Sequence, residues 1–582
     1  MRVTRRGWIG ATAAMAGVSM APTVQAESSG FAARPPIPAA PDSRFQIRAR
    51  GAGQHDYTPA LEALRDYARA ELAGVGLPGM TLAVTDTEGF TAVLGLGWAD
   101  ADQRIPVRPD HFFQIGSISK SFVALTVLAL ADQGRIDVDA PVARYLPDAA
   151  LPDEPITVAQ LLSHVSGLPD GAPLFPRTPN GRLWCGFAPG SRFSYSNTGY
   201  VILGRLIERV TGLPHRRAVA ELVRAKLNLV EMAGTIAQAR RPEFAVGYWP
   251  WDRTAAASLP GARLEFASWD EEDSPAGSIG ATSEQMAVYL RALLRLGRGE
   301  GAPILSDAAA RRFAAPVIAA DEDFGAGAGY ACGVATQPVD GVSCLHHTGG
   351  MMAFSSSFHA DPAAGVACFA SVNARNAGYR PRATTAYAIQ LMRAARGGAP
   401  LPAAPDPLAP YRVRNVAAFL GTYRAADLTI ALAEGPAGLR LESARGVGRV
   451  RPAGTDRLVT DHPGLSGFGF DAVRENGEVV ALWWGETLLG RGAPRQRPAS
   501  PEALGALAGS YLNRDPWVGG ARVVARGDTL WVDGVGRLVE RGGWWSAEKD
   551  PGGVERLRFD GFLGGRAQRL NVSGDDLLRI TV

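Results

Sequence analysis

The sequence predicts an α+β fold: an antiparallel sheet flanked by helices with a helical subdomain, followed by two small antiparallel β-barrels. Three observations favour it. Strand-like runs stand at both ends of residues 57–398 with helical patterns between them, two proline-rich segments follow, and a weak repeat fills the rest of the chain. With 582 residues, the chain is long enough for three or more domains.

The first domain is expected to begin with a helix and a hairpin. Thr58 and Pro59 suit an N-cap and a first helical position, and the apolar residues after them have helical spacing. Strand patterns over residues 81–85 and 90–97 are joined by a turn. Residues 117–133 are apolar almost all round, which predicts a buried helix.

Further helices and strands follow in two blocks. Helical patterns cover residues 157–163, 199–212, 216–227 and 282–296. Strand patterns cover residues 329–336, 342–348, 354–360 and 364–372, before a last helix over residues 382–395. We expect these strands and the first hairpin to form the antiparallel sheet, with helices around it.

The C-terminal part is expected to hold two barrels, over residues 411–493 and 503–582. A proline-rich break precedes each of them, as is typical of domain connections. Residues 419–423 (FLGTY) resemble residues 507–511 (LAGSY), and alternating strand patterns follow both segments. The aromatic residues of this part favour a filled core over a ligand pocket.

Residues 1–26 have the features of a twin-arginine signal peptide. Two arginines precede an uncharged, largely apolar run over residues 7–21, and a small-residue cleavage site ends at Ala26. Cleavage there would give a periplasmic or secreted bacterial protein. A short membrane anchor is the alternative, although the run is too brief to span a bilayer comfortably. Residues 27–56 should then form a flexible leader.

Charge and composition exclude several functions. The formal net charge of +3 falls to neutral without residues 1–26, so no basic field remains to attract nucleic acid or an anionic membrane. No later stretch is long and apolar enough for stable membrane insertion. No cysteine spacing suggests a zinc site. Cys332 and Cys344 flank an expected hairpin turn, where a disulfide and a pair of free buried thiols are both compatible with the sequence.

Ser117 and Lys120 are the first candidates for chemistry. They lie at the start of the buried helix, where positions i and i+3 share one face. A hydroxyl needs a base to become a nucleophile, and a desolvated amine can serve as that base, whereas arginine stays protonated. Only three of the 60 basic residues are lysines, and one of them stands here. The N–H of Ser117, free at a helix N-terminus, could also bind an oxyanion. The alternative is a lysine that extends from a buried helix to solvent.

Two further groups support a catalytic interpretation. Tyr195 and Asn197 lie on a loop that enters a helix. A phenol near a cation can act as general base and then acid, and the asparagine can hold either a substrate amide or the lysine. Residues 347–350 (HTGG) end a strand, and their glycines would let a substrate approach the strand edge.

These three groups, in this order, resemble the motifs of the penicillin-recognising serine hydrolases, which include class C β-lactamases, D,D-carboxypeptidases, D-aminopeptidases and esterases. The resemblance covers about residues 59–395 and includes residues 161–169, 245–248 and 277–283. It implies an enzyme that needs no metal or organic cofactor.

The resemblance implies a role for each matching residue. Ser117 would be the acylated nucleophile, and Lys120 and Tyr195 its proton-transfer partners. The residues that would bind the substrate are Asn197, His347, Thr348 and Gly349. The N–H groups of Ser117 and Gly350 would form the oxyanion hole.

The third motif indicates a substrate class. Penicillin-hydrolysing relatives usually carry Lys-Thr-Gly there, and neutral His347 is a weaker partner for a carboxylate. The histidine favours D-aminopeptidases and esterases, and two C-terminal barrels resemble D-aminopeptidase. The expected substrates are therefore short peptides containing D-residues, with a carboxylesterase acting on a small ester as the alternative. Outside enzymes, the alternative is a non-catalytic protein that binds the cell wall or an apolar ligand.

Three other polar features are expected near these motifs. His346 should lie on the opposite face of the strand from its neighbour and have a structural role. His164 is expected to cap or pack a helix end. The acidic run over residues 270–273 is expected to be a solvated loop, with binding of a substrate ammonium group as the alternative.

Overall fold

A 10-stranded antiparallel sheet forms the centre of the first domain. The computed structural model describes residues 37–580 apart from 39–40, 54, 175, 177, 179, 251–259, 376–378, 437, 516 and 551. The strand order is β1-β3-β2-β14-β13-β12-β11-β10-β9, and β4 pairs with β3. The strands are β1 (Gln46–Arg50), β2 (Gly79–Asp86), β3 (Phe90–Asp100), β4 (Ile105–Pro106), β9 (Ile318–Ala319), β10 (Gly329–Tyr330), β11 (Ala335–Val339), β12 (Val342–Gly350), β13 (Ser355–Asp361) and β14 (Val366–Val372).

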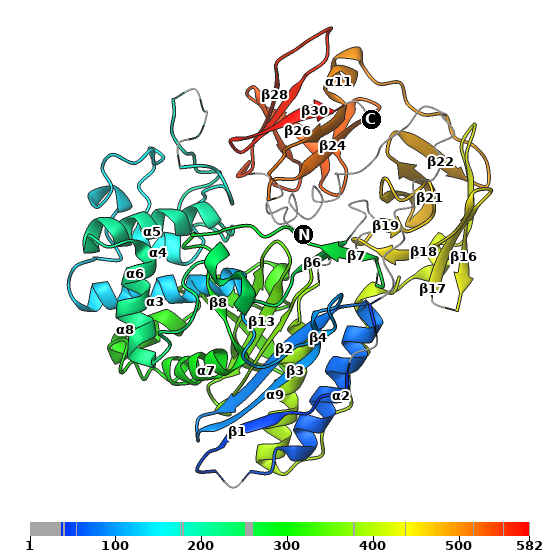
Figure 1. Ribbon diagram of the computed structural model, residues 1–582. Coiled ribbons are helices and arrows are strands. Elements are labelled where there is room, and N and C mark those ends of the chain that lie inside the picture. Colours follow the sequence, from blue (N-terminus) through cyan, green and yellow to red (C-terminus); the bar gives the residue numbers. More distant parts are fainter. Residues whose placement is uncertain are drawn as a thin grey trace.

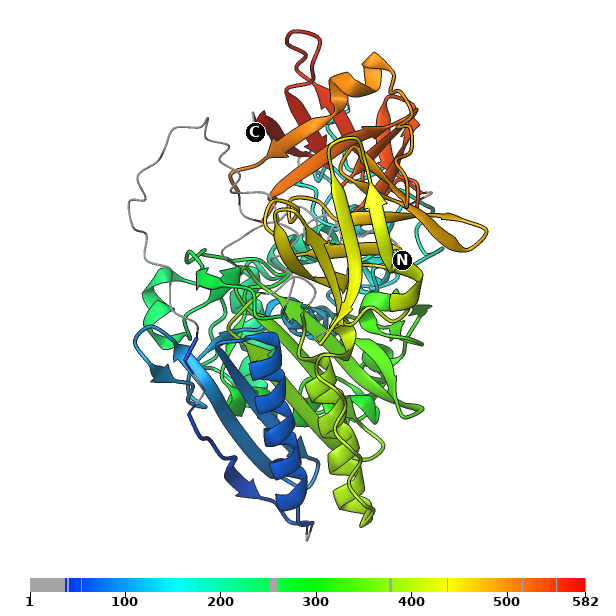
Figure 2. The same cartoon turned by 90° about the vertical axis from the view of Figure 1, so that its right-hand side faces the viewer.

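Helices cover both faces of this sheet (Figure 1). On one face, α2 (Thr58–Val75) and α9 (Arg382–Gly397) lie side by side and share an apolar core with β2 and β14 (Figure 2). A second apolar core joins the other face to the helices α3 (Ser119–Asp132), α4 (Val158–Leu162), α5 (Asn197–Thr211), α6 (His215–Val219), α7 (Ser283–Gly297) and α8 (Asp307–Ala314). The predicted α+β class with a helical subdomain is confirmed.

The buried helix begins with a 3-10 turn (Gly116–Ile118) and continues as α3. The turn packs beside the end of β12. Gly116 has a φ of +57°, and a Cβ there would lie 2.6 Å from the nitrogen of Gly350. A Cβ on Gly349 would lie 1.8 Å from the carbonyl oxygen of Ile115. Glycine at these positions therefore permits the close approach of the turn to the strand.

The C-terminal part forms two closed barrels, as predicted. The first consists of β15 (Gly421–Arg424), β16 (Thr429–Gly435), β17 (Gly438–Ser443), β18 (Gly446–Pro452), β19 (Arg457–Thr460), β20 (Phe470–Glu475), β21 (Glu478–Trp484) and β22 (Thr487–Arg491). The second consists of β23 (Gly509–Leu512), β24 (Gly520–Arg526), β25 (Thr529–Val532), β26 (Gly536–Arg541), β27 (Trp544–Ala547), β28 (Leu557–Asp560), β29 (Arg569–Val572) and β30 (Asp575–Ile580). Each barrel has its own core of buried apolar side chains.

The repeat seen in the sequence has a structural counterpart. The hydroxyl of Tyr423 donates to the carbonyl of Phe419 at 2.9 Å in the first barrel, and Tyr511 donates to Leu507 at 2.7 Å in the second. Both tyrosines are fully buried. The two similar segments therefore start their barrels in the same way.

The interpretation of residues 27–56 as a flexible leader is wrong for its last part. Gln46–Arg50 form β1, which pairs with β3 at the edge of the sheet, and the indole N–H of Trp98 donates to Pro38 at 3.0 Å. The unpaired backbone groups of β3 explain this pairing, because an edge strand readily adds another strand. Residues 1–36, including the expected signal peptide, lie outside the described residues.

One other expectation needs correction, and the choice left open for Cys332 and Cys344 falls to the free thiols. The strand expected over residues 329–336 is two strands, β10 and β11, because a turn at Ala331–Val334 separates them. All four cysteines are free. Cys332 packs into the core on the side of the helical subdomain, whereas Cys344 packs into the core on the side of α2 and α9, so the sheet separates the two thiols.

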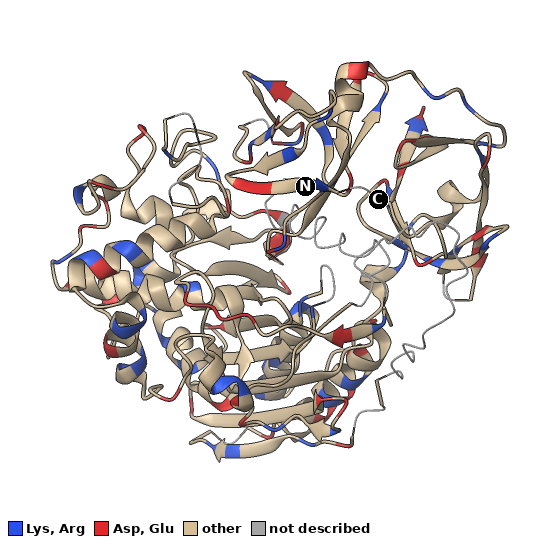
Figure 3. Ribbon diagram, turned by 45° about the horizontal axis from the view of Figure 1, so that its top comes forward, with Lys and Arg blue, Asp and Glu red and all other residues tan. Residues whose placement is uncertain are grey.

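Charge is distributed evenly over the fold. Lys and Arg positions are interspersed with Asp and Glu positions in the sheet domain and in both barrels (Figure 3). Within the described residues, none of the helices combines the length and apolar character needed to cross a bilayer.

Candidate active site

The structure brings Ser117 and Lys120 together, as the sequence predicts. Nζ of Lys120 donates to Oγ of Ser117 at 3.1 Å. Lys120 is completely buried on a helix that is itself surrounded by apolar side chains. Ser117 is 6% exposed. The alternative of a lysine that extends to solvent is therefore wrong.

Two further oxygens surround the lysine nitrogen. Nζ lies 2.6 Å from Oδ1 of Asn197 and 2.6 Å from the carbonyl oxygen of Ala276. Both oxygens can only accept hydrogen bonds, so each fixes one N–H of Lys120. When the amine is neutral, its lone pair can then point at the Ser117 hydroxyl, which is the geometry a general base requires.

Asp170 determines which way the Asn197 amide faces. Asn197 is the first residue of α5, and both its backbone N–H and its Nδ2 donate to Oδ1 of Asp170, at 3.0 and 2.9 Å. Because Nδ2 is held by the carboxylate, Oδ1 of the amide is directed at Lys120. Of the two roles predicted for Asn197, holding the lysine is the one these contacts show. Sequence reasoning did not find Asp170, although it directly follows the matched segment 161–169.

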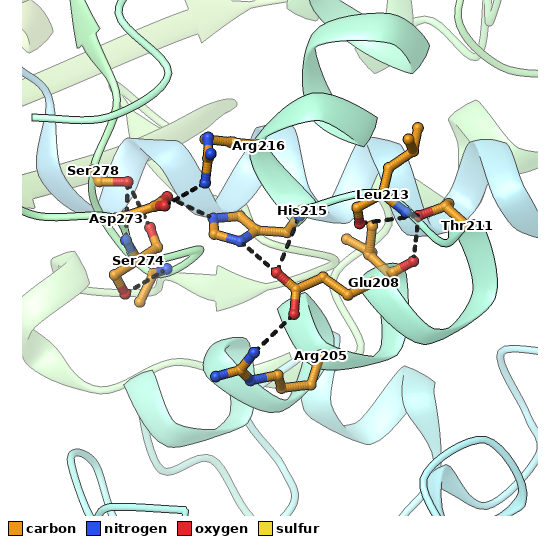
Figure 4. Close-up of polar contacts among 11 residues, drawn as sticks. Arg205, Glu208, Thr211, Leu213, His215, Arg216, Asp273, Ser274 and Ser278 are labelled. Carbon is orange, nitrogen blue, oxygen red and sulfur yellow. Dashed lines mark hydrogen bonds and ion pairs between the residues drawn. The ribbon is translucent and has the colours of Figure 1, made fainter.

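A short turn places the carbonyl of Ala276 beside the lysine. The Ser278 hydroxyl donates to the Ser274 carbonyl at 2.9 Å, and the N–H of Ala276 donates to the Ser274 hydroxyl at 3.2 Å. Just before this turn, the carboxylate of Asp273 lies 2.6 Å from the guanidinium of Arg216 and 3.5 Å from the ring of His215. The His215 ring lies between Asp273 and Glu208 (Figure 4). The turn is therefore anchored to the start of α6.

The acidic run over residues 270–273 is not a freely solvated loop. Asp270 accepts the indole N–H of Trp517 at 2.6 Å, and Glu271 accepts the N–H of Gln238 at 2.6 Å. Burial raises the pKa of Glu272 to about 6. Since Asp270, Glu271 and Asp273 bind other parts of the chain, their observed role is to anchor the turn, and they give no support to an ammonium site.

Tyr195 lies directly beside the lysine. It is 2% exposed, and Nζ of Lys120 is 5.0 Å from the centre of its ring. The ring packs on His164, with centroids 4.1 Å apart. His164 also accepts the N–H of Ser196 at Nδ1, at 3.0 Å, and its carbonyl accepts the N–H of Ser194 at 2.8 Å.

His164 therefore does more than pack a helix end, because it also positions Tyr195. It follows the end of α4, as expected for a residue that packs a helix end, and its φ is +56°. Its ring and backbone together hold the loop that carries Tyr195. The sequence signal that could have shown this is its place inside the matched segment 161–169.

His347 is buried behind the site. Its Nε2 lies 2.9 Å from the hydroxyl of Tyr330, and its Nδ1 lies 2.6 Å from the carbonyl oxygen of Thr348. A neutral ring with its proton on Nδ1 satisfies both contacts, because the carbonyl only accepts and the phenol can donate. The ring is 6.4 Å from that of Tyr195. In this arrangement the ring of His347 packs among aromatic rings, with those of Phe324 and Tyr330 5.3 and 5.8 Å away.

The predicted oxyanion groups lie where the 3-10 turn meets β12. Gly116, next to Ser117, packs against the backbone of Gly350, as described above. Gly350 and Asn197 are partly exposed, whereas Thr348 is buried. Arg380 lies beside this position, since a Cβ on Gly350 would be 2.6 Å from its guanidinium. Arg380 also donates to Ser355 at 3.3 Å, and sequence reasoning did not identify it.

His346 lies on the other face of β12, as predicted. It stacks on His359 with centroids 4.2 Å apart, and His359 contacts Thr385 of α9. Burial lowers the pKa of His346 to about 3. A neutral, completely buried histidine on the far face fits the structural role expected for it.

Comparison with known proteins decides the family. The Beta-lactamase family model matches residues 64–392, which is more than half of the chain. The chain belongs to the beta-lactamase family. The resemblance seen in the motifs is thereby confirmed, and Ser117, Lys120, Tyr195, Asn197 and residues 347–350 all lie inside the matched segment.

Individual curated proteins match parts of the chain. Esterase EstB from Burkholderia gladioli is 33% identical over 285 residues, which are 42% of this chain and 71% of the esterase. Protein flp from Staphylococcus aureus (strain NCTC 8325 / PS 47) is 24% identical over 231 residues, which are 37% of this chain. The match spans 45% of the length of that staphylococcal protein.

One solved structure shares the fold over a larger part of the chain. It is the octameric penicillin-binding protein homologue from Pyrococcus abyssi, with a TM-score of 0.53 and 20% sequence identity. The match covers 73% of this chain and 98% of that one. It supports the architecture of the beta-lactamase family described above.

Proposed function

We propose that the protein is a serine hydrolase that forms an acyl-enzyme on Ser117. The observation that carries the proposal is the completely buried Lys120, held by two acceptor oxygens and 3.1 Å from the Ser117 hydroxyl. A non-catalytic binding protein would have no use for this arrangement, because burying an amine costs free energy that only a specific role offsets.

The contacts support a two-stage reaction. Ser117 Oγ attacks the carbonyl carbon of the substrate while Lys120 accepts its proton, and the N–H groups of Ser117 and Gly350 bind the oxyanion that forms. The proton then passes to the leaving group, with Tyr195 beside the lysine as the second transfer group. In the second stage, water attacks the acyl carbon, its proton returns through the same groups, and Ser117 is released.

The proposed substrates are short peptides or amides with D-residues, and the second candidate is a small ester. The two C-terminal barrels favour the first class, in line with the resemblance to D-aminopeptidase. The 33% identity to a protein named an esterase favours the second. Small esters need fewer contacts for turnover, so both activities can share one site.

Labelling with a fluorophosphonate probe tests the proposal. We expect the wild-type protein to gain one adduct and Ser117→Ala to gain none. Hydrolysis of D-alanine amide, a D-Ala-D-Ala dipeptide, nitrocefin and p-nitrophenyl acetate then separates the substrate classes. Absence of labelling together with absence of turnover would favour the binding-protein alternative.

We also propose that the protein is exported through the twin-arginine pathway to the periplasm or beyond. Support comes from the arginine pair, the apolar run and the small-residue site in residues 1–26. Replacing Arg5 and Arg6 by lysine should retain the full-length precursor in the cytoplasmic fraction. An unchanged distribution would contradict export by this route.

A further inference from the structure

The second barrel is docked on the loop that leads into α5. The connection between β27 and β28 contacts this loop, where the indole N–H of Trp184 donates to the carbonyl of Val554 at 2.9 Å. Gly186 packs so closely there that a Cβ on it would lie 2.6 Å from Val554. Arg192 pairs with Asp550 at 3.5 Å. Residues far apart in the sequence therefore form a closely packed interface.

Glu555 lies at the centre of this interface. It is 3% exposed. Its Oε1 accepts the backbone N–H of Asp170 at 2.7 Å, and its Oε2 accepts the hydroxyl of Ser573, from the turn between β29 and β30, at 2.5 Å. The carboxylate is thus fixed by its own barrel and holds a backbone group of the other domain.

Asp170 is the same residue that directs the Asn197 amide. The contacts run from Glu555 Oε1 to the N–H of Asp170, from Asp170 Oδ1 to both N–H groups of Asn197, and from Asn197 Oδ1 to Lys120 Nζ. None of these distances exceeds 3.0 Å. Because Asp170 is buried, loss of the Glu555 oxygen would leave its N–H without this acceptor and favour a shifted loop.

We propose that Glu555 of the second barrel is a positioning residue for Lys120, acting through Asp170 and Asn197. Glu555 does not touch the reacting atoms. It sets the place of the amide oxygen that holds the amine against Ser117, so that the site is complete only when the second barrel is docked. The inference rests on the proposed function, since it concerns the reactivity of Ser117.

The rate of fluorophosphonate labelling at Ser117 tests this role without knowledge of the natural substrate. Glu555→Leu should slow labelling by about tenfold to a hundredfold, the cost typical of a small displacement of a catalytic group. Glu555→Gln keeps an acceptor oxygen and should restore most of the rate. Glu548→Gln, an exposed position on the same connection, is the matched control and should label at the wild-type rate.

A double-variant cycle separates positioning from general stability. In an Asn197→Ala background, Glu555→Leu should slow labelling no further, because the link it acts through is already gone. If Glu555→Leu fails to fold, Glu555→Asp, whose side chain is too short to reach the Asp170 N–H, is measured in the same way. Wild-type labelling rates in Glu555→Leu or in Glu555→Asp, or an equal loss in both backgrounds, would overturn the inference. Failure of the wild type itself to label would instead count against the proposed function.

Discussion

Nζ of Lys120 lies 2.6 Å from Oδ1 of Asn197, and Asp170 holds the other end of that amide. An amide oxygen binds the amine without adding a negative charge next to it. A carboxylate in the same place would instead favour the ammonium form of the lysine, which cannot accept the Ser117 proton.

This relationship predicts the effect of a single-atom change. Asn197→Asp should lower kcat/KM for an activated ester by about a hundredfold near neutral pH, because the protonated lysine cannot act as a base. The acidic limb of the pH–rate profile should also move to higher pH. Stopped-flow measurement of p-nitrophenyl acetate hydrolysis between pH 6 and 10 checks both effects.

The control is Asn180→Asp, which makes the same chemical change at an exposed asparagine on the preceding loop. It should leave the profile unchanged. An Asn197→Asp profile that superimposes on the wild-type one would show that the amide does not control the charge of the lysine.

Glu71 should make stability depend on pH. Burial between α2 and α9 raises the pKa of its carboxyl from the ordinary value of 4.5 to about 7. The folded protein thus binds this proton more tightly than the unfolded chain does. The tighter proton binding adds about 3 kcal/mol to the free energy of unfolding. This contribution is complete below about pH 4 and is lost as the pH rises to about 7.

Glu71→Gln removes the titrating group and should remove this dependence. Between pH 4 and pH 8 the wild type should lose about 3 kcal/mol of unfolding free energy that the variant does not lose. Urea unfolding at several pH values measures it. Glu62→Gln, exposed on the same helix, is the control. A constant difference across this range would contradict a buried carboxyl with a raised pKa.

A buried ionic network should hold the two barrels together. Asp471 of the first barrel accepts from Arg457 at 2.7 Å and from Arg526 of the second barrel at 2.9 Å. Asp471→Ala should lower the unfolding free energy by about 3 kcal/mol, because it removes the carboxylate that pairs with the buried Arg526. Asp456→Ala breaks an exposed pair with Arg474 and should cost about 1 kcal/mol or less. Equal losses of unfolding free energy in Asp471→Ala and Asp456→Ala, measured by urea unfolding, would contradict a stabilising role of the network.

The local parts of the site could be predicted from the sequence. Ser117 and Lys120 share a helix turn, Tyr195 lies two residues before Asn197 at the start of α5, and residues 347–350 share a strand, so their spacing carried the signal. Strong apolar patterns likewise predicted the sheet and the helices. β1 escaped prediction because its side chains are all exposed and show no apolar alternation.

The contacts that complete the site could not be predicted in this way. Ala276 acts through a backbone carbonyl, which every residue possesses. Asp170 and Glu555 meet only because the second barrel docks on the first domain, and His164 and Tyr330 act by packing behind residues that the motifs did reveal. Such roles depend on tertiary structure and leave no local pattern.

The most direct test of the central claim is the mass of the intact protein after exposure to a fluorophosphonate, compared between wild type and Lys120→Met. Lys226→Met, at an exposed lysine, is the control. We expect a Ser117 adduct in the wild type and in the control, and labelling slowed by at least about a hundredfold in Lys120→Met. Labelling of Lys120→Met at the wild-type rate, or an adduct on a residue other than Ser117, would contradict the central claim.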